Sequence, residues 1–190
     1  ELINLYKQKR LNEALLLCNK IIVQDNTNPL FYNILGLIKF VLKKIDEAIV
    51  AYEKGIKIKP DLAVIHSNLG NLYKSINNLD LAEKKYNLAI SLDKNLPEPY
   101  NNMGNLMRLL NKYDESIKFF KKSINLDKNF FWGYYNLATT YTAIGNFEEA
   151  TYYLQETIKL NPFFCSAHRS LSRLTTYKKN DSHLLIMKKL

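Results

Sequence analysis

The side chains that most often perform catalysis or bind metals are scattered through this chain of 190 residues. Two of the three histidines, His66 and His168, have no cysteine or carboxylate at the spacing of a metal site. The chain also has no glycine-rich phosphate loop and no pair of carboxylates arranged as a general acid and base. We therefore expect no catalytic residue, no metal site and no cofactor.

Three asparagines are better candidates for a chemical role, because Asn68, Asn102 and Asn136 recur at intervals of 34 residues. An amide side chain offers hydrogen-bond donors and an acceptor. At a constant interval, such amides could bind the peptide groups of an extended chain, whatever its side chains are. The alternative is that they cap or bridge neighbouring helices, and the sequence leaves both interpretations open.

The same interval of 34 residues runs through most of the chain. The segment His66–Ser75 returns as Tyr100–Leu109 and again as Tyr134–Ala143. A longer series keeps an isoleucine at one place, namely Ile22, Ile56, Ile90, Ile124 and Ile158. A fixed period of this size predicts supersecondary units that stack on one another, each burying its apolar face against its neighbours.

Each unit is predicted to be a helix, a short turn and a second helix. Ala82 and Tyr86 are four residues apart and so share one face of a second helix. We expect first helices to start near Pro29, Ala63, Pro97 and Phe131, and second helices near Asn12, Asp46, Asp80, Asp114 and Glu148. The turns between them contain Lys43-Lys44, Asn77-Asn78, Asn111-Lys112 and Gly145-Asn146. We divide a single solenoid into a partial repeat (1–28), four full repeats (29–62, 63–96, 97–130, 131–164) and C-terminal capping helices (165–190).

These residues resemble the tetratricopeptide repeat signature over nearly the whole chain. The repeat at 63–96 carries it at His66, Leu69, Gly70, Tyr73, Ala82, Tyr86 and Ala89. The resemblance implies an all-α fold, a right-handed superhelix of antiparallel helix pairs whose first helices line a concave wall. By that register, the candidate peptide-binding residues on the wall are Asn68, Asn71, Lys74, Asn101, Asn102, Asn105, Arg108, Trp132, Tyr135, Asn136 and Thr139.

One known binding mode of such a wall is the asparagine ladder of the O-GlcNAc transferases, where asparagine at this register binds the substrate backbone. The ladder here is similar to it at Asn68, Asn102 and Asn136. The similarity fails at Ile34 and Ser170, so the predicted ladder has three rungs.

A second known mode, the chaperone-type carboxylate clamp, matches at Asn71 and Asn102 only. Its basic positions are occupied here by Ser67, Trp132 and Asn136, and we therefore disfavour it. Trp132 lies in the most aromatic stretch of the chain, residues 130–135, and could serve as an anchor for a partner. Packing in the core is the alternative for Trp132, and both remain open.

The net charge of +9 comes from lysines that are spread through every repeat. This spread favours a solvated outer face over a nucleic-acid site. The apolar runs are shorter than the roughly 20 residues that cross a bilayer. We expect Cys18 and Cys165 to be buried free thiols, which fits a reducing compartment, and hence a cytoplasmic protein.

The sequence thus predicts a scaffold that binds a protein or peptide and performs no catalysis itself. The alternative is a substrate-recruiting arm of a larger transferase, because Ala167–Leu190 is similar to the junction in bacterial proteins that place these repeats ahead of a sulfotransferase domain. A glycosyltransferase is possible for the same reason. The chain begins at Glu1 and ends within a predicted helix at Leu190, so we interpret it as part of a longer polypeptide.

Overall fold

The computed structural model describes residues 1–175 and Met187, and all the regular structure of these residues is helical. The helices are α1 (Leu2–Lys7), α2 (Leu11–Gln24), α3 (Pro29–Val41), α4 (Ile45–Ile58), α5 (Ala63–Ser75), α6 (Leu79–Leu92), α7 (Pro97–Leu109), α8 (Tyr113–Leu126), α9 (Phe131–Ala143), α10 (Phe147–Leu160) and α11 (Cys165–Leu174). The predicted all-α class is confirmed. A further helix over residues 181–190 was expected, and this segment lies outside the described residues, Met187 excepted.

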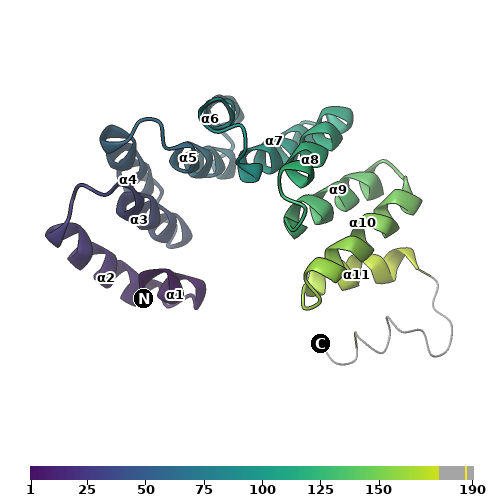
Figure 1. The fold of residues 1–190 in the computed structure, drawn as a ribbon, viewed down its shortest axis with the longest axis horizontal. Coiled ribbons are helices and arrows are strands. Elements are labelled where there is room, and N and C mark those ends of the chain that lie inside the picture. Colours follow the sequence, from purple (N-terminus) through teal and green to yellow (C-terminus); the bar gives the residue numbers. More distant parts are fainter. Residues whose placement is uncertain (176–186, 188–190) are drawn as a thin grey trace. The chain divides into compact units, whose positions relative to one another are not determined.

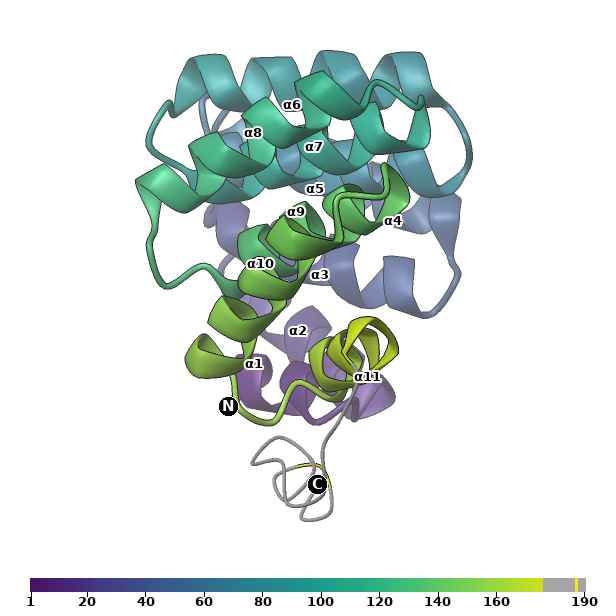
Figure 2. The same cartoon turned by 90° about the vertical axis from the view of Figure 1, so that its right-hand side faces the viewer.

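The helices belong to two compact units, Glu1–Asn95 with α1 to α6 and Leu96–Leu190 with α7 to α11. In the first unit α3 packs on α4 and α5 on α6, and in the second α7 packs on α8 and α9 on α10 (Figure 1). Figure 2 shows the last of these pairs, α9 and α10, side by side. Each pair lies within one repeat expected from the sequence, while the assembly of the repeats into one solenoid stays a prediction.

The helix ends follow the predicted pattern closely. The four first helices begin at the predicted residues, and the second helices begin one residue earlier than predicted, at Leu11, Ile45, Leu79, Tyr113 and Phe147. Acidic side chains therefore lie within the first turn of each second helix, where the helix dipole favours negative charge. In the turns of the full repeats, Lys43, Asn77, Asn111 and Gly145 have positive φ angles, as expected for residues that end a helix.

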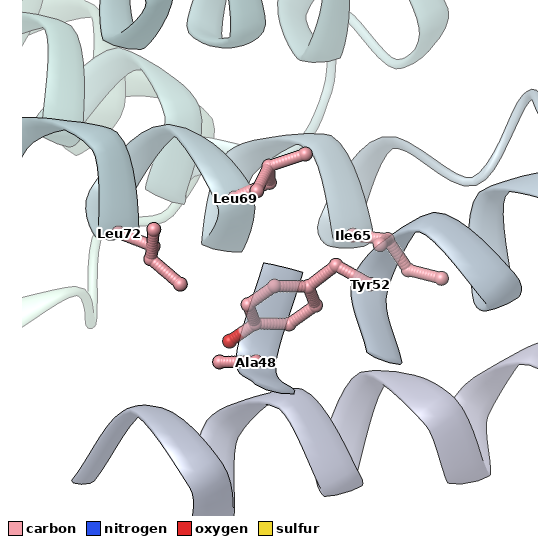
Figure 3. Close-up of a cluster of buried hydrophobic side chains, with 5 residues drawn as sticks. All are labelled: Ala48, Tyr52, Ile65, Leu69 and Leu72. Atoms are coloured by element: carbon pink, nitrogen blue, oxygen red, sulfur yellow. The ribbon is translucent and has the colours of Figure 1, made fainter. Parts of the chain in front are cut away.

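In three helix pairs, an aromatic ring of the second helix packs closely against a glycine of the first. A Cβ atom on Gly36 would lie 2.5 Å from the ring of Tyr52, and one on Gly70 would lie 2.6 Å from the ring of Tyr86. These distances are too short for carbon atoms, so only glycine permits this packing. Figure 3 shows the buried cluster around the first ring, which comprises Ala48, Tyr52, Ile65, Leu69 and Leu72.

The second unit shows what happens when the ring is replaced. Gly104 faces the ring of Phe120, where an added Cβ would lie 2.7 Å away. In the next repeat, Leu154 occupies the position of the aromatic residue and Ala138 occupies that of the glycine. Both side chains are buried in one cluster with Leu171 of α11. We infer that the smaller, non-planar leucine leaves room for the alanine methyl group.

The two cysteines differ in exposure. Cys18 is fully buried among the helices of the first repeats, and its Sγ lies 3.5 Å from the carbonyl oxygen of Phe31, to which it donates. Cys165 is exposed, so the prediction of a buried thiol is wrong there. The reason is its place as the first residue of α11, at a helix end rather than on the packed face.

We predict that Leu154→Phe destabilises the protein, because the ring would meet the Ala138 methyl group, and that Ala138→Gly in the same chain restores much of the loss. The expected cost of the single substitution is about 2 kcal/mol, as for other overpacked cores. Urea denaturation of both single variants and the double variant measures this coupling. Strictly additive effects would contradict the proposed contact.

We also predict that one thiol reacts with a water-soluble maleimide at pH 8 in the folded protein and that two react in denaturant. Burial raises the pKa of the Cys18 thiol to about 11, so at pH 8 almost none of it is thiolate, and the side chain is enclosed as well. Mass spectrometry of the labelled protein identifies the site, which should be Cys165. Equal labelling of both cysteines under native conditions would show that the first repeats are not packed as described.

Candidate functional site

The asparagines predicted to form a ladder make hydrogen bonds between repeats. In the first unit, Nδ2 of Asn68 on α5 donates to Oδ1 of Asn33 on α3 at 2.8 Å. In the second unit, Nδ2 of Asn136 on α9 donates to Oδ1 of Asn101 on α7, also at 2.8 Å. Two of the three ladder residues therefore have the bridging geometry that the sequence left open as an alternative.

The two bridges differ in how much of the amide stays accessible. Asn68 is half-buried, whereas Asn136 is 9% exposed and its partner Asn101 is 7% exposed. Asn33, the partner of Asn68, was not among the predicted site residues. A sequence signal for it existed, because Asn33 and Asn101 are two periods apart and each precedes its partner by 35 residues.

One turn further along the first helices, a second set of asparagines engages its oxygen atoms instead. Oδ1 of Asn71 accepts a hydrogen bond of 2.7 Å from the hydroxyl of Tyr86 on α6. Oδ1 of Asn105, at the same register on α7, accepts one of 3.2 Å from Nη2 of Arg108. The difference arises because the residue at the register of Tyr86 is Phe120, which has no hydroxyl.

Burial of the ring raises the pKa of Tyr86 well above that of a free tyrosine, so its hydroxyl stays protonated and keeps donating. Tyr52 lies at the same register in the preceding repeat, and burial raises its pKa in the same direction. Its hydroxyl has no hydrogen-bond partner, because Leu37 stands where Asn71 stands in the next repeat. The amide of Asn71 is thus held by the hydroxyl of Tyr86, whose ring is buried in the core.

The two predicted cations, Lys74 on α5 and Arg108 on α7, are half-buried and occupy the same register. Each follows an asparagine, Asn71 or Asn105, by three residues, which places both side chains on one face of the helix. Nε of Arg108 is buried and has no hydrogen-bond partner. This face therefore carries amides and a positive charge at the C-terminal end of the helix.

The predicted aromatic anchor is partly packed and partly open. Trp132 is 44% exposed, and its ring makes an edge contact with Tyr135 at 6.4 Å between centroids. Phe164, which precedes α11, packs against both rings, and Phe131 packs against Trp132 and Phe164. One side of the indole is packed against neighbouring aromatic rings, whereas contact of its exposed part with a partner stays a prediction.

The remaining predicted residues are also placed. Asn102 is half-buried on α7, and Thr139 is half-buried on α9, where its hydroxyl donates to the carbonyl oxygen of Asn136.

His66 and His168 are buried, and Nε2 of each lies within 3 Å of a proline carbonyl oxygen, that of Pro60 or of Pro162. No cluster of three histidine, cysteine or acidic residues suited to a metal occurs in the described part of the chain. Among the same residues, no helix has the length and apolar character needed to cross a bilayer.

Comparison with known proteins identifies the repeats. A family model described as a TPR repeat matches residues 36–77 and 104–145, and two described as a tetratricopeptide repeat match 63–96 and 133–161. No similar sequence is found among curated proteins.

Several solved structures share the fold. TTC0263, a thermophilic TPR protein of Thermus thermophilus, has a TM-score of 0.82 at 16% identity, covering 91% of this chain and 94% of that one. A chain of the APC/C hetero-tetramer Cut9–Hcn1 gives 0.82 at 17% identity, with 91% of this chain and 35% of that chain covered. YrrB, a TPR protein with an unusual peptide-binding site, gives 0.61 at 22% identity, with 90% and 88% covered.

The matched repeats together span residues 36–96 and 104–161, which is more than half of the chain, and the helix pairs described above correspond to them. The chain belongs to the tetratricopeptide repeat family.

Proposed function

We propose that each unit of this chain binds an extended segment of a partner protein along the polar faces of its first helices, with α5 contributing in the first unit and α7 and α9 in the second. The fold itself suggests a protein–protein interaction scaffold. The finer proposal rests on the amides of α5, α7 and α9, and chiefly on how their donors and acceptors are used within the repeats. We propose the eleven residues predicted from the sequence as the contact set, with the half-buried amides carrying most of the binding.

The proposal rests on which atoms of each amide are hydrogen-bonded within the protein and which remain for a ligand. Asn68 uses one N–H in its bridge to Asn33, so its Oδ1 remains to accept from a peptide N–H. Asn71 and Asn105 use their oxygen atoms, so their N–H groups remain to donate to a peptide carbonyl. A peptide group carries one donor and one acceptor, and these two positions supply the complement of both.

Amides that bind peptide groups accept a ligand of any sequence, which is what the predicted ladder requires. YrrB, one of the proteins of similar fold, has a peptide-binding site, which supports the same use of the fold here. Trp132, 44% exposed beside Tyr135, would add an apolar anchor in the second unit. Asn136, at 9% exposure, contributes mainly by holding α9 to α7.

The alternative role, a substrate-recruiting arm of a sulfotransferase or glycosyltransferase, rests on the resemblance of Ala167–Leu190 to a domain junction. Residues 176–186 and 188–190 of this segment lie outside the described part of the structure. That role therefore stays a prediction of the sequence.

A stability measurement tests the bridging role first. Asn136→Ala leaves Oδ1 of the buried Asn101 without its partner and should lower the free energy of unfolding by about 1–3 kcal/mol. Asn101→Ala should cost a similar amount, and the double variant should cost about 1 kcal/mol less than the sum of the two. Additive costs in urea denaturation would mean that the two amides do not interact. For this reason alanine at Asn68, Asn102 and Asn136 together would confuse lost binding with lost stability.

The binding test therefore uses the second set of amides. We predict that Asn71→Ala with Asn105→Ala, in a chain that also carries Tyr86→Phe, captures about tenfold less of a random dodecapeptide library than Tyr86→Phe alone. Tyr86→Phe is the matched control, because it removes the hydroxyl that Asn71→Ala would otherwise leave unpaired in the core. Capture on the immobilised protein is measured by mass spectrometry, and equal capture by the two variants would refute the amide mechanism.

A further inference from the structure

We propose that the side chains of Asn105 and Arg108 on α7 form a subsite for the carboxylate of an aspartate or glutamate in the partner segment. This inference rests on the proposed function and names the chemistry of the segment. It concerns the second unit alone, where both residues lie on one helix face.

The hydrogen bond between the two side chains leaves mainly donors unused. Nη2 of Arg108 donates to Oδ1 of Asn105 at 3.2 Å, which fixes the orientation of the amide. The Nδ2 group of Asn105 is then directed away from that bond with two N–H donors, and the guanidinium keeps further donors of its own. The amide oxygen is already engaged, so the groups that remain are mainly donors, and the positive charge of the guanidinium makes a carboxylate a stronger ligand for them than a neutral peptide carbonyl.

The charge of Arg108 is not balanced inside the described structure. Arg108 takes part in none of the ion pairs found among the described residues, such as those of Arg10, Lys39 and Lys159 with glutamates. Its side chain is half-buried and its Nε is shielded from solvent without a partner. A cation that has lost part of its hydration and has no counter-charge is unfavourable, and a carboxylate that docks against it would relieve this cost.

The helices packed around Arg108 supply no acid that takes this place. The only acidic residue of α7 is Glu98 in the first turn, ten residues from Arg108 and so about 15 Å away along the helix. The acidic residues in the first turn of α8 form no ion pair with Arg108. The helix α9 contains no acid, and its Thr139 and Thr142 hydroxyls donate to carbonyl oxygens of their own helix. An external carboxylate is therefore the fitting partner for the guanidinium.

Two further observations favour an acidic partner. Asn71 and Lys74 repeat the spacing of Asn105 and Arg108 on α5, and the oxygen of Asn71 is also engaged, by Tyr86. The whole chain carries a net charge of +9, which attracts acidic segments and repels basic ones. A phosphate group would satisfy the same donors, but an aspartate or glutamate needs no modification of the partner.

The test uses three sets of degenerate dodecapeptides as probes. The first set contains aspartate and glutamate at half of its positions and has amidated C-termini, and the second is identical except that asparagine and glutamine replace the acids. The third has no acidic side chain but carries free C-terminal carboxylates. Each set is applied to the immobilised full chain, to Arg108→Gln and to Lys118→Gln. The last variant is the matched control, because it loses one exposed charge from α8 of the same unit.

We expect the unmodified chain to capture the acidic set about tenfold better than the amide set, and Arg108→Gln to lose most of that preference. Lys118→Gln should keep it. Equal capture of the acidic and amide sets, or equal effects of the two substitutions, would overturn this inference while leaving the proposed function intact. A preference for the third set would assign the subsite to a terminal carboxylate instead and so overturn the side-chain assignment. Capture of no set at all would overturn the proposed function together with the inference.

Discussion

Three helix pairs, α3–α4, α5–α6 and α7–α8, each depend on one close contact, where a buried ring of the second helix lies against a glycine of the first. Tyr52, Tyr86 and Phe120 are fully buried at this point, so each contributes the burial of a large apolar surface. The contact also fixes the rotation of the first helix, because a ring can approach the backbone closely on one side only. The polar residues next to this contact on the same helix, such as Asn71 and Asn105, are positioned as a consequence.

The amides have two distinct roles, which depend on their position within the 34-residue period. Amides 35 residues apart tie one repeat to the next, as Asn68 does with Asn33 and Asn136 with Asn101. Amides one turn further on are held within their own repeat, as Asn71 is by Tyr86. Amides that link repeats, such as Asn68, use an N–H donor, whereas amides held within a repeat, such as Asn71, use the oxygen acceptor. The groups that remain for a ligand therefore differ from one turn of the helix to the next.

Much of the fold could be predicted from the sequence, because helix starts, turns and the small-to-large spacing are local features that recur. The first helices start as predicted, and Asn77 and Gly145 take the positive φ expected of turn residues. The partner of Asn68 could not be predicted in the same way, because the bond joins side chains 35 residues apart and depends on how two helices are rotated. Cys165 was misplaced because a position on a predicted helix does not by itself imply burial, and this residue begins α11, where it is exposed.

Differences between repeats in the core also determine the chemistry of the polar face. Tyr86 holds the oxygen of Asn71 with its hydroxyl, and in the next repeat Phe120 cannot do the same for Asn105. The oxygen of Asn105 is therefore left for Arg108, and this bond turns the amide and the guanidinium into a set of donors. Because Phe120 lacks the hydroxyl group of Tyr86, the second unit has a preference for negative charge, which its own helices α7 and α9 do not satisfy.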